Sequence, residues 1–496
     1  MDELKENPVA LSQATLSELK GVDVPRYDRA GLTPGIVHIG LGNFHRAHQA
    51  WYLHRLMQEG LCHDWAIIGA GVRAGDAAQR ERLLAQDCLT TLIELDPSGR
   101  SAEICGAMID FLPVEPDNAA LIARMAEPDV RIVSLTVTEG GYFIDPATGG
   151  FDAQHADIVH DAANPDAPRT AFGAMIAALA RRRAAGHGAF TCQSCDNLQG
   201  NGAVLRQTII SLAALSDPEL AAWIEAEASF PNSMVDCIVP ATGPAEIALA
   251  RGFGIDDAAP VTHENFRQWV IEDDFCAGRP DWDRVGATFS DRVHDFEMMK
   301  IRILNGGHQV IAGAGDLLGL ETIAQTMAHD GIRGLLRKVV LDEIAPHVDP
   351  VPGMTPEAYL DLIERRFGNP EIRDTTRRVA FDGSSRQPGF IAPSIRNGLA
   401  AETPVEGLAL VSALWARYCA GTREDGSVIE ANDPNWELLN GTAKAAQKTP
   451  SSWLAMRQFY GDLADHARFA DAFVHWLTAI YDDGVEATIA AYLKTA

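Results

Sequence analysis

The stretch MMKIRILNGGHQ, residues 298–309, carries residue types that could do chemistry within an otherwise apolar run. Its apolar residues recur at helical spacing, yet Lys300, Asn305 and His308 interrupt the pattern and two adjacent glycines follow the asparagine. Each glycine costs about 1 kcal/mol relative to alanine in a helix interior. At about 100° per residue, the lysine, asparagine and histidine lie within one arc of an α-helix. Either something other than stability sets these positions, or the segment is not a regular helix.

A glycine-rich turn follows the first predicted strand, in GIVHIGLGNFHRAHQ (35–49). Gly40 permits a tight turn, and Gly42 lets the backbone approach a pyrophosphate at the start of a helix. Asn43 and Phe44 open that helix and belong to the same predicted cofactor site. His45 stands where the dinucleotide-binding fingerprint has its third glycine, so the prediction depends mainly on the position of the turn.

Two more loops follow predicted strands. Thr138 is the last residue of the predicted strand at 131–138, Glu139 and Gly140 follow it, and Asn197 comes after the strand at 189–194. Ligands of a doubly wound sheet bind beyond the carboxyl ends of its strands, so these loops are candidate cofactor contacts. Ordinary turn chemistry explains the same residues equally well.

The acid that binds the cofactor ribose is expected about 20 residues beyond the glycine turn. The second predicted strand ends there in IIGAG without an acid, and the next candidates are Arg73 and Asp76. An acid favours NAD because it repels a 2′-phosphate, whereas an arginine favours NADP. Spacing alone leaves this choice open.

The elements that must position these residues indicate an α/β fold. Predicted strands at 35–39, 65–71, 88–95, 131–138 and 189–194 alternate with helices such as 170–186, which is typical of a Rossmann-type, doubly wound and mainly parallel sheet. From about residue 295 the apolar runs have helical spacing, at 322–345, 407–421 and 470–484. We therefore predict an NAD-binding domain over 1–294 and a mostly α-helical, substrate-binding and catalytic domain over 295–496.

Composition excludes several classes of function. A net charge of −27 disfavours nucleic acids and anionic membrane surfaces as partners. The first 20 residues lack the basic start and apolar core of a signal peptide, so none is expected, and without a run of about 18 apolar residues no transmembrane helix is expected. Eight scattered cysteines suit a reducing cytoplasm. Cys192 and Cys195 form a lone CxxC without a second cluster, which favours packing over a metal site, and we predict no bound metal.

Five separated motifs carry a family resemblance from about residue 35 to the C-terminus: IVHIGLGNFHRAHQ, SLTVTEGGY, SCDNLQGNG, FPNSMVD and EMMKIRILNGGH. In order and spacing they resemble the polyol-specific long-chain dehydrogenases, the mannitol dehydrogenase family. The resemblance implies a zinc-independent enzyme that uses NAD(P) and pairs a Rossmann-type domain with a helical one. It also implies interconversion of a polyol and a ketose, or of a sugar acid and its keto form.

The resemblance assigns catalytic roles. Lys300 is the general base that takes the hydroxyl proton while hydride leaves for the nicotinamide, provided that desolvation and the cationic ring depress its pKa. Asn197 and Asn305 form an oxyanion hole for the developing alkoxide. His308 orients the substrate, and Glu297 helps to move protons between the lysine and solvent. Ligand or backbone passing close by would then explain the two glycines that follow Asn305.

By the same resemblance, Asp236, Arg378 and Arg386 bind the outer hydroxyls of the substrate. The chain departs from the mannitol enzymes at one of these positions, with Arg386 in place of a lysine, and at the residue after Asp236, with Cys237 in place of an arginine. Two arginines in one pocket would suit a carboxylate, which raises the prospect of a sugar-acid substrate.

For the cofactor, the resemblance places the NAD-favouring acid on Asp76, while Gly75 replaces a neighbouring acid and softens discrimination against NADP. The leading hypothesis is NAD-dependent interconversion of D-mannitol and D-fructose. Alternatives are fructuronate reduction, D-arabinitol or sorbitol oxidation, a non-catalytic NAD-binding regulator and a zinc alcohol dehydrogenase. A cytoplasmic monomer or weak oligomer is expected.

Overall fold

A computed structural model describes residues 7–145 and 149–495. The chain divides into two compact units, residues 1–294 and 295–496. Within the described residues, every strand belongs to the first unit, and the second unit is built from helices.

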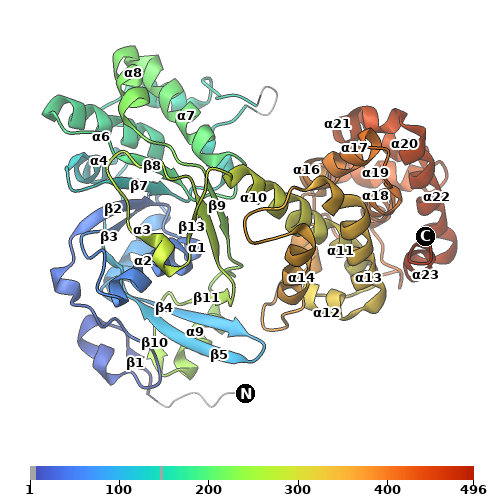
Figure 1. Ribbon diagram of the computed structural model, residues 1–496, viewed down its shortest axis with the longest axis horizontal. Helices are drawn as coiled ribbons and strands as arrows, with labels where there is room; N and C mark the ends of the chain where they lie inside the picture. The colour runs from blue at the N-terminus through green and yellow to red at the C-terminus, as the bar shows by residue number, and fades with distance from the viewer. Residues whose placement is uncertain (1–6, 146–148, 496) are drawn as a thin grey trace. The chain divides into compact units, whose positions relative to one another are not determined.

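A five-stranded parallel sheet forms the centre of the first unit (Figure 1). From edge to edge its strands are β6 (Met108–Phe111), β3 (Ala66–Ala70), β2 (Pro34–Ile39), β7 (Ile132–Leu135) and β8 (Thr191–Ser194). The chain builds outward from β2 to β3 and β6, then returns to place β7 and β8 on the other side. This reversal between β2 and β7 is the point where a Rossmann-type sheet binds its ligand, so the predicted fold class is confirmed.

Both faces of this sheet are covered, as its continuous apolar strands require. Val37 and Val133 face one apolar cluster, whereas their neighbours Ile36 and Ile132 face another. The first cluster is closed by α4 (Ala119–Ala126), α5 (Ala156–Ala163), α6 (Ala171–Ala185), α7 (Asn201–Ser216) and α8 (Pro218–Glu227). The second is closed by α2 (Gln49–Gln58) and α3 (Asp76–Leu84), together with buried tryptophans.

Besides the central sheet, the described part of the first unit contains two three-stranded sheets and one two-stranded sheet. One three-stranded sheet contains β11 (Val261–Glu264), β4 (Thr90–Asp96) and β5 (Gly99–Cys105), and the other contains β13 (Thr288–Phe289), β12 (Gln268–Ile271) and β9 (Ser233–Asp236). The predicted strand at 88–95 is therefore present as β4, but it lies outside the doubly wound sheet. The two-residue turn Pro97-Ser98 folds β4 back on β5 as an antiparallel hairpin. A short parallel pair joins β1 (Val9–Ala10) to β10 (Ile255–Asp256), which follows α9 (Pro244–Gly252).

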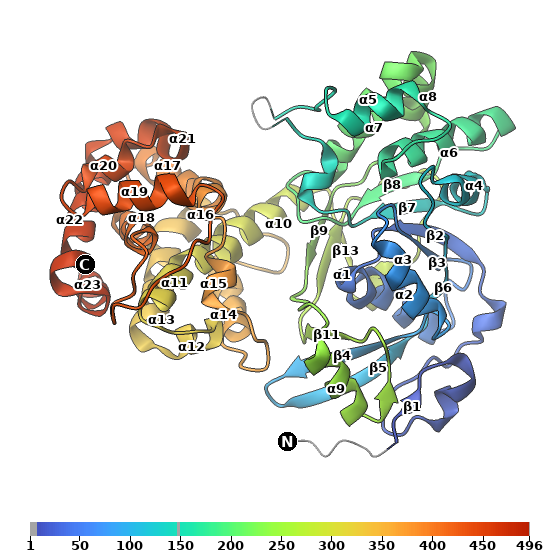
Figure 2. The same ribbon diagram turned by 180° about the vertical axis from the view of Figure 1, so that it is seen from behind.

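The second unit packs its helices around α18 (Glu406–Cys419) (Figure 2). The residues of α18 from Gly407 to Cys419 are all buried. Helices α11 (Gly306–Leu317), α13 (Asp330–Val339), α19 (Trp436–Ala446) and α22 (Ala467–Asp483) pack against α18. The predicted helices at 407–421 and 470–484 are α18 and α22. The other helices are α10 (Val293–Met299), α12 (Ile323–Ala328), α14 (Pro356–Phe367), α15 (Thr376–Val379), α16 (Gly383–Arg386), α17 (Ala392–Ala400), α20 (Ser451–Leu454), α21 (Arg457–Tyr460) and α23 (Val485–Tyr492).

Three π-helical segments interrupt these helices: η5 (Lys300–Asn305), η6 (Val340–Ile344) and η8 (Gln387–Ile391). The segment that carries Lys300 is thus not a regular α-helix. The prediction that Lys300, Asn305 and His308 lie within one arc assumed α-helical winding at about 100° per residue, and η5 does not have it. A π-helix bonds residue i to i+5, so the five-residue spacing from Lys300 to Asn305 is one π turn. Gly306 lies where the three segments meet, since a Cβ there would be 3.8 Å from Phe390 O in η8 and 3.9 Å from Ile344 Cδ1 in η6.

Candidate active site

The glycine turn between β2 and the short helix α1 (Asn43–Ala47) leaves space for a ligand. Gly40 has φ +89°, and a Cβ there would lie 2.2 Å from the carbonyl oxygen of Thr136, so no other residue fits. The Thr136 hydroxyl donates a hydrogen bond of 2.6 Å to the Gly40 carbonyl and ties the turn to the end of β7. A Cβ at Gly42 would meet no atom closer than 4.0 Å. The backbone at Gly42 is therefore open to close approach, as a pyrophosphate requires.

Asn43 and Phe44 hold the start of α1 in place. The Asn43 carboxamide donates to Pro240 O (3.0 Å) and to the Thr242 hydroxyl (2.9 Å), while its oxygen accepts from the buried Arg46 (2.8 Å). Phe44 stacks on the ring of His48, with centroids 4.8 Å apart. Both side chains thus stabilise the turn that carries Gly42.

His45, in place of the third glycine, fills the space beneath the turn. Its ring stacks on His38 with centroids 3.4 Å apart, and neither of its nitrogens has a hydrogen-bond partner. Burial lowers the pKa of His45 well below its usual value and that of His38 to about 3, so both rings are neutral near neutral pH. Sequence reasoning noted the substitution but not the stack, because the partner lies in the preceding strand.

A buried carboxylate, Asp196, organises the loop after β7. It accepts hydrogen bonds from the backbone N–H groups of Val137 (3.0 Å) and Thr138 (2.9 Å) and from the Tyr142 hydroxyl (2.7 Å). Thr138 has φ +70°, a strained conformation for a β-branched residue. The next residue, Asn197, is exposed. Asp196 therefore fixes the predicted cofactor loop and the backbone that carries Asn197, a role that its place in SCDN does not reveal.

The predicted cofactor loop also contains Glu139 and Gly140. A Cβ at Gly140 would meet no atom within 4 Å, so this position is open. The side chain of Glu139 lies outside the described part of the structure, although its backbone begins a 3-10 turn.

Asp236 ends β9 and is buried. Hydrogen bonds link its strand to the Asp196 loop: the Ser233 hydroxyl donates to Ser194 O (2.7 Å), and Asn201 donates to Asp196 O (3.0 Å) and Ser233 O (2.8 Å). In the first unit, hydrogen bonds thus link the strand that ends in Asp236 to the loop that carries Asn197, and Asp196 links that loop to Thr138.

The two candidates for ribose recognition lie in the loop after β3. Asp76 accepts a hydrogen bond from the backbone N–H of Arg73 (2.9 Å), and Arg73 donates to Val137 O (3.1 Å). A Cβ on Gly71 would lie only 2.3 Å from the side chain of Asp76, so this glycine makes room for the acid. The Asp76 carboxylate is therefore fixed in the loop, and one guanidinium nitrogen of Arg73 is already hydrogen-bonded to the protein.

In the second unit, Glu297, Lys300, Asn305 and His308 follow one another along α10, η5 and α11. Glu297 and Lys300 are buried, with exposed fractions of 5% and 8%, whereas Asn305 and His308 are half-buried. The two groups that the sequence analysis assigns to proton transfer are thus both largely shielded from water.

His308 is held by stacking. Its ring lies on Phe367 with centroids 4.0 Å apart, and its Nε2 is shielded from solvent without a hydrogen-bond partner. Burial lowers the pKa of His308 to about 3; the nearby Arg378, Arg366 and Arg386 act in the same direction, and Asp374 opposes them. The imidazole is therefore neutral near neutral pH and has an unused ring nitrogen for a ligand.

The two predicted substrate arginines lie close to His308 but are already engaged. Arg378 pairs through two contacts of 2.6 Å with Asp374, which is buried. Arg386 donates to Val379 O (2.6 Å), and Gln309 of α11 donates to the same carbonyl (3.2 Å). The structure thus brings His308, Arg378 and Arg386 together, and it adds Asp374, which the sequence analysis missed although it stands four residues before Arg378.

Cys192 and Cys195 are free, buried thiols, and burial raises the pKa of Cys195. In the described residues, no group of three His, Cys, Asp or Glu side chains is placed to hold a metal ion. No helix of the described chain is both long and apolar enough to cross a bilayer.

Comparison with known proteins gives matches over nearly the whole chain. Residues 34–284 match the mannitol dehydrogenase Rossmann domain, and residues 292–481 match the mannitol dehydrogenase C-terminal domain. A mannitol 2-dehydrogenase of Cereibacter sphaeroides is 58% identical over 474 residues, which cover 96% of this chain and 99% of that relative. One from Aspergillus terreus is 40% identical over 501 residues, covering 99% of this chain and 100% of that relative.

Two solved structures of polyol dehydrogenases also match nearly the whole chain. Pseudomonas fluorescens mannitol 2-dehydrogenase, in a ternary complex with NAD and D-mannitol, matches with a TM-score of 0.87 and 41% identity, over 98% of this chain and 100% of that chain. A D-sorbitol dehydrogenase in substrate-free form matches with a TM-score of 0.90 and 37% identity, over 97% of this chain and 100% of that chain. The chain belongs to the mannitol dehydrogenase family, as its motifs predict.

Proposed function

We propose that this protein is an NAD-dependent polyol dehydrogenase that interconverts D-mannitol and D-fructose. The names of the similar mannitol 2-dehydrogenases support the substrate, and the NAD complex of the Pseudomonas enzyme supports the cofactor. The open backbone at Gly42 and Gly140 suits a dinucleotide. The fixed carboxylate of Asp76, beside an arginine that is partly engaged, favours NAD over NADP.

The mechanism assigns one task to each group. Bound NAD supplies the hydride acceptor. The buried Lys300 amine takes the proton of the reacting hydroxyl and returns it to the ketone oxygen in the reverse direction. Asn197 and Asn305 donate hydrogen bonds to the developing alkoxide. Glu297 passes the proton between the lysine and solvent.

Substrate binding completes this assignment. Neutral His308 uses its free Nε2 to hydrogen-bond and orient the substrate. Asp236, Arg378 and Arg386 bind the outer hydroxyls of the substrate. Arg378 can donate to a hydroxyl while it stays paired with Asp374, because a guanidinium has five N–H donors.

The ion pair between Arg378 and Asp374 is the observation that favours a neutral polyol over a sugar acid as the substrate. With both contacts at 2.6 Å, the buried carboxylate of Asp374 neutralises the arginine, so a substrate carboxylate would compete with an ion pair that is already formed. Reduction of a sugar acid such as fructuronate remains the second candidate, because Arg386 adds another guanidinium close to His308.

Steady-state kinetics with NADH test this choice. We expect kcat/KM for D-fructose to exceed that for fructuronate. Replacing Asp374→Asn removes the neutralising charge and should raise the relative kcat/KM for fructuronate about tenfold, the scale of one charge-assisted hydrogen bond. A wild-type preference for fructuronate would reverse the substrate assignment and leave the roles of Lys300 and the asparagines standing.

A further inference from the structure

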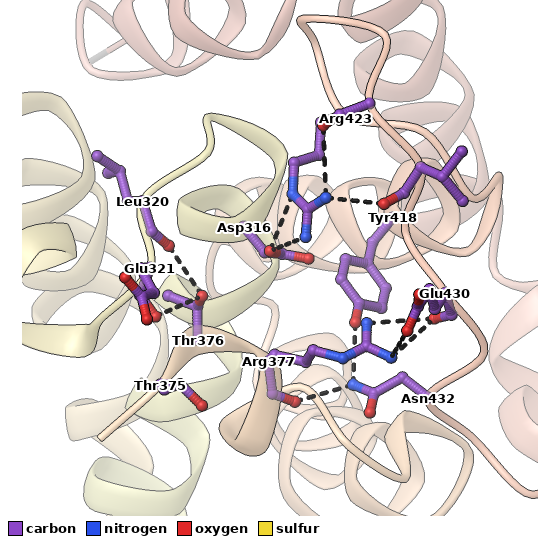
Figure 3. Close-up of polar contacts among 12 residues, drawn as sticks. Asp316, Leu320, Glu321, Thr375, Thr376, Arg377, Tyr418, Arg423, Glu430 and Asn432 are labelled. Carbon is purple, nitrogen blue, oxygen red and sulfur yellow. Dashed lines mark hydrogen bonds and ion pairs between the residues drawn. The ribbon is translucent and has the colours of Figure 1, made fainter. Parts of the chain in front are cut away.

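The segment between α18 and α19, residues 420–435, reaches from α11 to α15 and α16; we call it the strap. Its first anchor is Arg423, which donates to the buried Asp316 near the end of α11 through Nε (3.1 Å) and Nη2 (2.8 Å) (Figure 3). A third contact, to Val428 O (2.8 Å), folds the strap back on itself. The strap is thus tied to the helix that carries His308.

A second anchor, at Asn432, holds α15. The Asn432 amide group donates to Arg377 O (2.8 Å) and to the Tyr418 hydroxyl (2.9 Å) (Figure 3). In return, the guanidinium of Arg377 donates to the backbone carbonyls of Glu430 (3.2 Å) and Ala431 (3.0 Å). Arg377 is the residue directly before Arg378.

A third anchor, at Asp433, holds α16. One oxygen of Asp433 accepts from the Ser384 backbone N–H (2.8 Å), and the other accepts from the Ser384 hydroxyl (2.7 Å). Asn432 O accepts from Asp382 N (3.1 Å), where the chain has φ +56°. Ser384 lies two residues before Arg386.

Helices α15 and α16 have four residues each, which is too short for either to be stable by itself. A Cβ at Gly383 would lie 2.4 Å from the indole nitrogen of Trp415, so the start of α16 has no room to shift toward α18. The strap supplies further contacts, to Arg377 of α15 and Ser384 of α16. The orientation of Arg378 and Arg386 therefore depends on Asn432 and Asp433.

We infer that Asn432 and Asp433 are positioning residues for substrate binding and that they act through Arg378 and Arg386. This inference rests on the proposed role of the two arginines in holding the outer hydroxyls of the polyol. Neither strap residue needs to touch substrate: each fixes the backbone from which an arginine reaches out.

Asp433→Asn tests the inference, because it keeps the size of the side chain and removes one of the two acceptors for Ser384. We expect KM for D-mannitol to rise roughly tenfold, with kcat changed less than about threefold and the NADH dissociation constant unchanged, since displacement of a binding group by a fraction of an ångström has effects of this order. Asp425→Asn is the matched control: it is an exposed strap residue whose carboxylate accepts from Ser427 N (2.8 Å), and in the described part of the chain no hydrogen bond or ion pair joins it to α15 or α16, so it should leave KM unchanged. Should Asp433→Asn fold poorly, Ser384→Ala removes the same hydroxyl contact from the other side.

A double-mutant cycle separates positioning from a general loss of stability. If Asp433 acts through Arg386, then Asp433→Asn should have little further effect on KM in an Arg386→Ala background. Additive effects, or an unchanged KM in Asp433→Asn while Arg386→Ala raises it, would overturn this inference alone. If Arg386→Ala and Arg378→Ala both leave KM for D-mannitol unchanged, the substrate assignment of the proposed function fails instead.

Discussion

Some residues of the candidate site could be picked out from the sequence, whereas their partners could not. Lys300, Asn305 and His308 stood out because polar groups in an apolar run need a reason, and their roles stay a prediction. Their partners could not be found this way. Asp374 and Asp196 resemble ordinary helix and turn residues in the sequence, and only the fold shows that one neutralises Arg378 and the other fixes the loop before Asn197.

The residue with the largest expected effect is Lys300. Without its amine, the hydroxyl proton would have to leave to water, so Lys300→Ala should lower kcat for D-mannitol oxidation about 10²–10⁴-fold, the range for a lost general base. NADH affinity should change little, because the glycine turn and its loops belong to the first unit. Fluorescence titration of NADH on the variant checks that half of the prediction.

At the scale of elements, the sequence predicted which segments are helices and strands more reliably than how they pair or wind. The central strands and α6, α18 and α22 follow from apolar periodicity. Assignment of β4 to a separate hairpin depends on long-range pairing, and the π-helical winding of η5 depends on contacts with η6 and η8. Neither is encoded in a local pattern.

Two glycines of α11 give a test of this packing. A Cβ at Gly315 would lie 2.4 Å from the Thr326 hydroxyl and 3.1 Å from Thr376 Cγ2, so Gly315→Ala should lower the free energy of unfolding by about 1–3 kcal/mol. At Gly306 the nearest atom would be 3.7 Å away, and Gly306→Ala should be neutral or stabilise by up to about 1 kcal/mol. Thermal or urea unfolding of the two variants checks the contrast, and equal destabilisation would show that η5 and α11 pack differently.

The sequence analysis explained Gly306 and Gly307 by a ligand or backbone passing close to them. At Gly307 the close neighbour is instead a side chain, since a Cβ there would lie 3.1 Å from Leu336 Cδ1. At Gly306 the neighbouring atoms leave ordinary van der Waals space, so protein backbone does not exclude a side chain there.

For the whole molecule, the buried histidines of the first unit couple stability to pH. Burial lowers the pKa of His38, His54 and His263 to about 3 and that of His45 well below its usual value. In the unfolded chain each titrates near 6.5. The unfolded state therefore binds more protons below that pH, so this stabilisation is complete above about pH 6.5 and is lost as pH falls toward 3.

We expect the first unit to become less stable by up to about 1.4 kcal/mol per histidine between pH 7.5 and pH 5.5. Unfolding curves at half-unit steps of pH measure the slope, which should correspond to the uptake of several protons. His475→Gln is the control, because that histidine is exposed and should not change the slope. Burial raises the pKa of Glu94 in the first unit and of Glu343 in the second, so both act in the opposite direction to the histidines. A flat stability profile over this range would contradict the account.

The most direct test of the central claim, that the Lys300 amine carries the proton in polyol oxidation, is chemical rescue of Lys300→Ala. The variant is saturated with NAD and D-mannitol, and turnover is followed by NADH formation with increasing concentrations of small primary amines. The account predicts very low turnover without amine, an increase that grows with the concentration of the neutral amine, and no such increase in wild type. A variant that turns over nearly as fast as wild type without any amine would show that another group is the base.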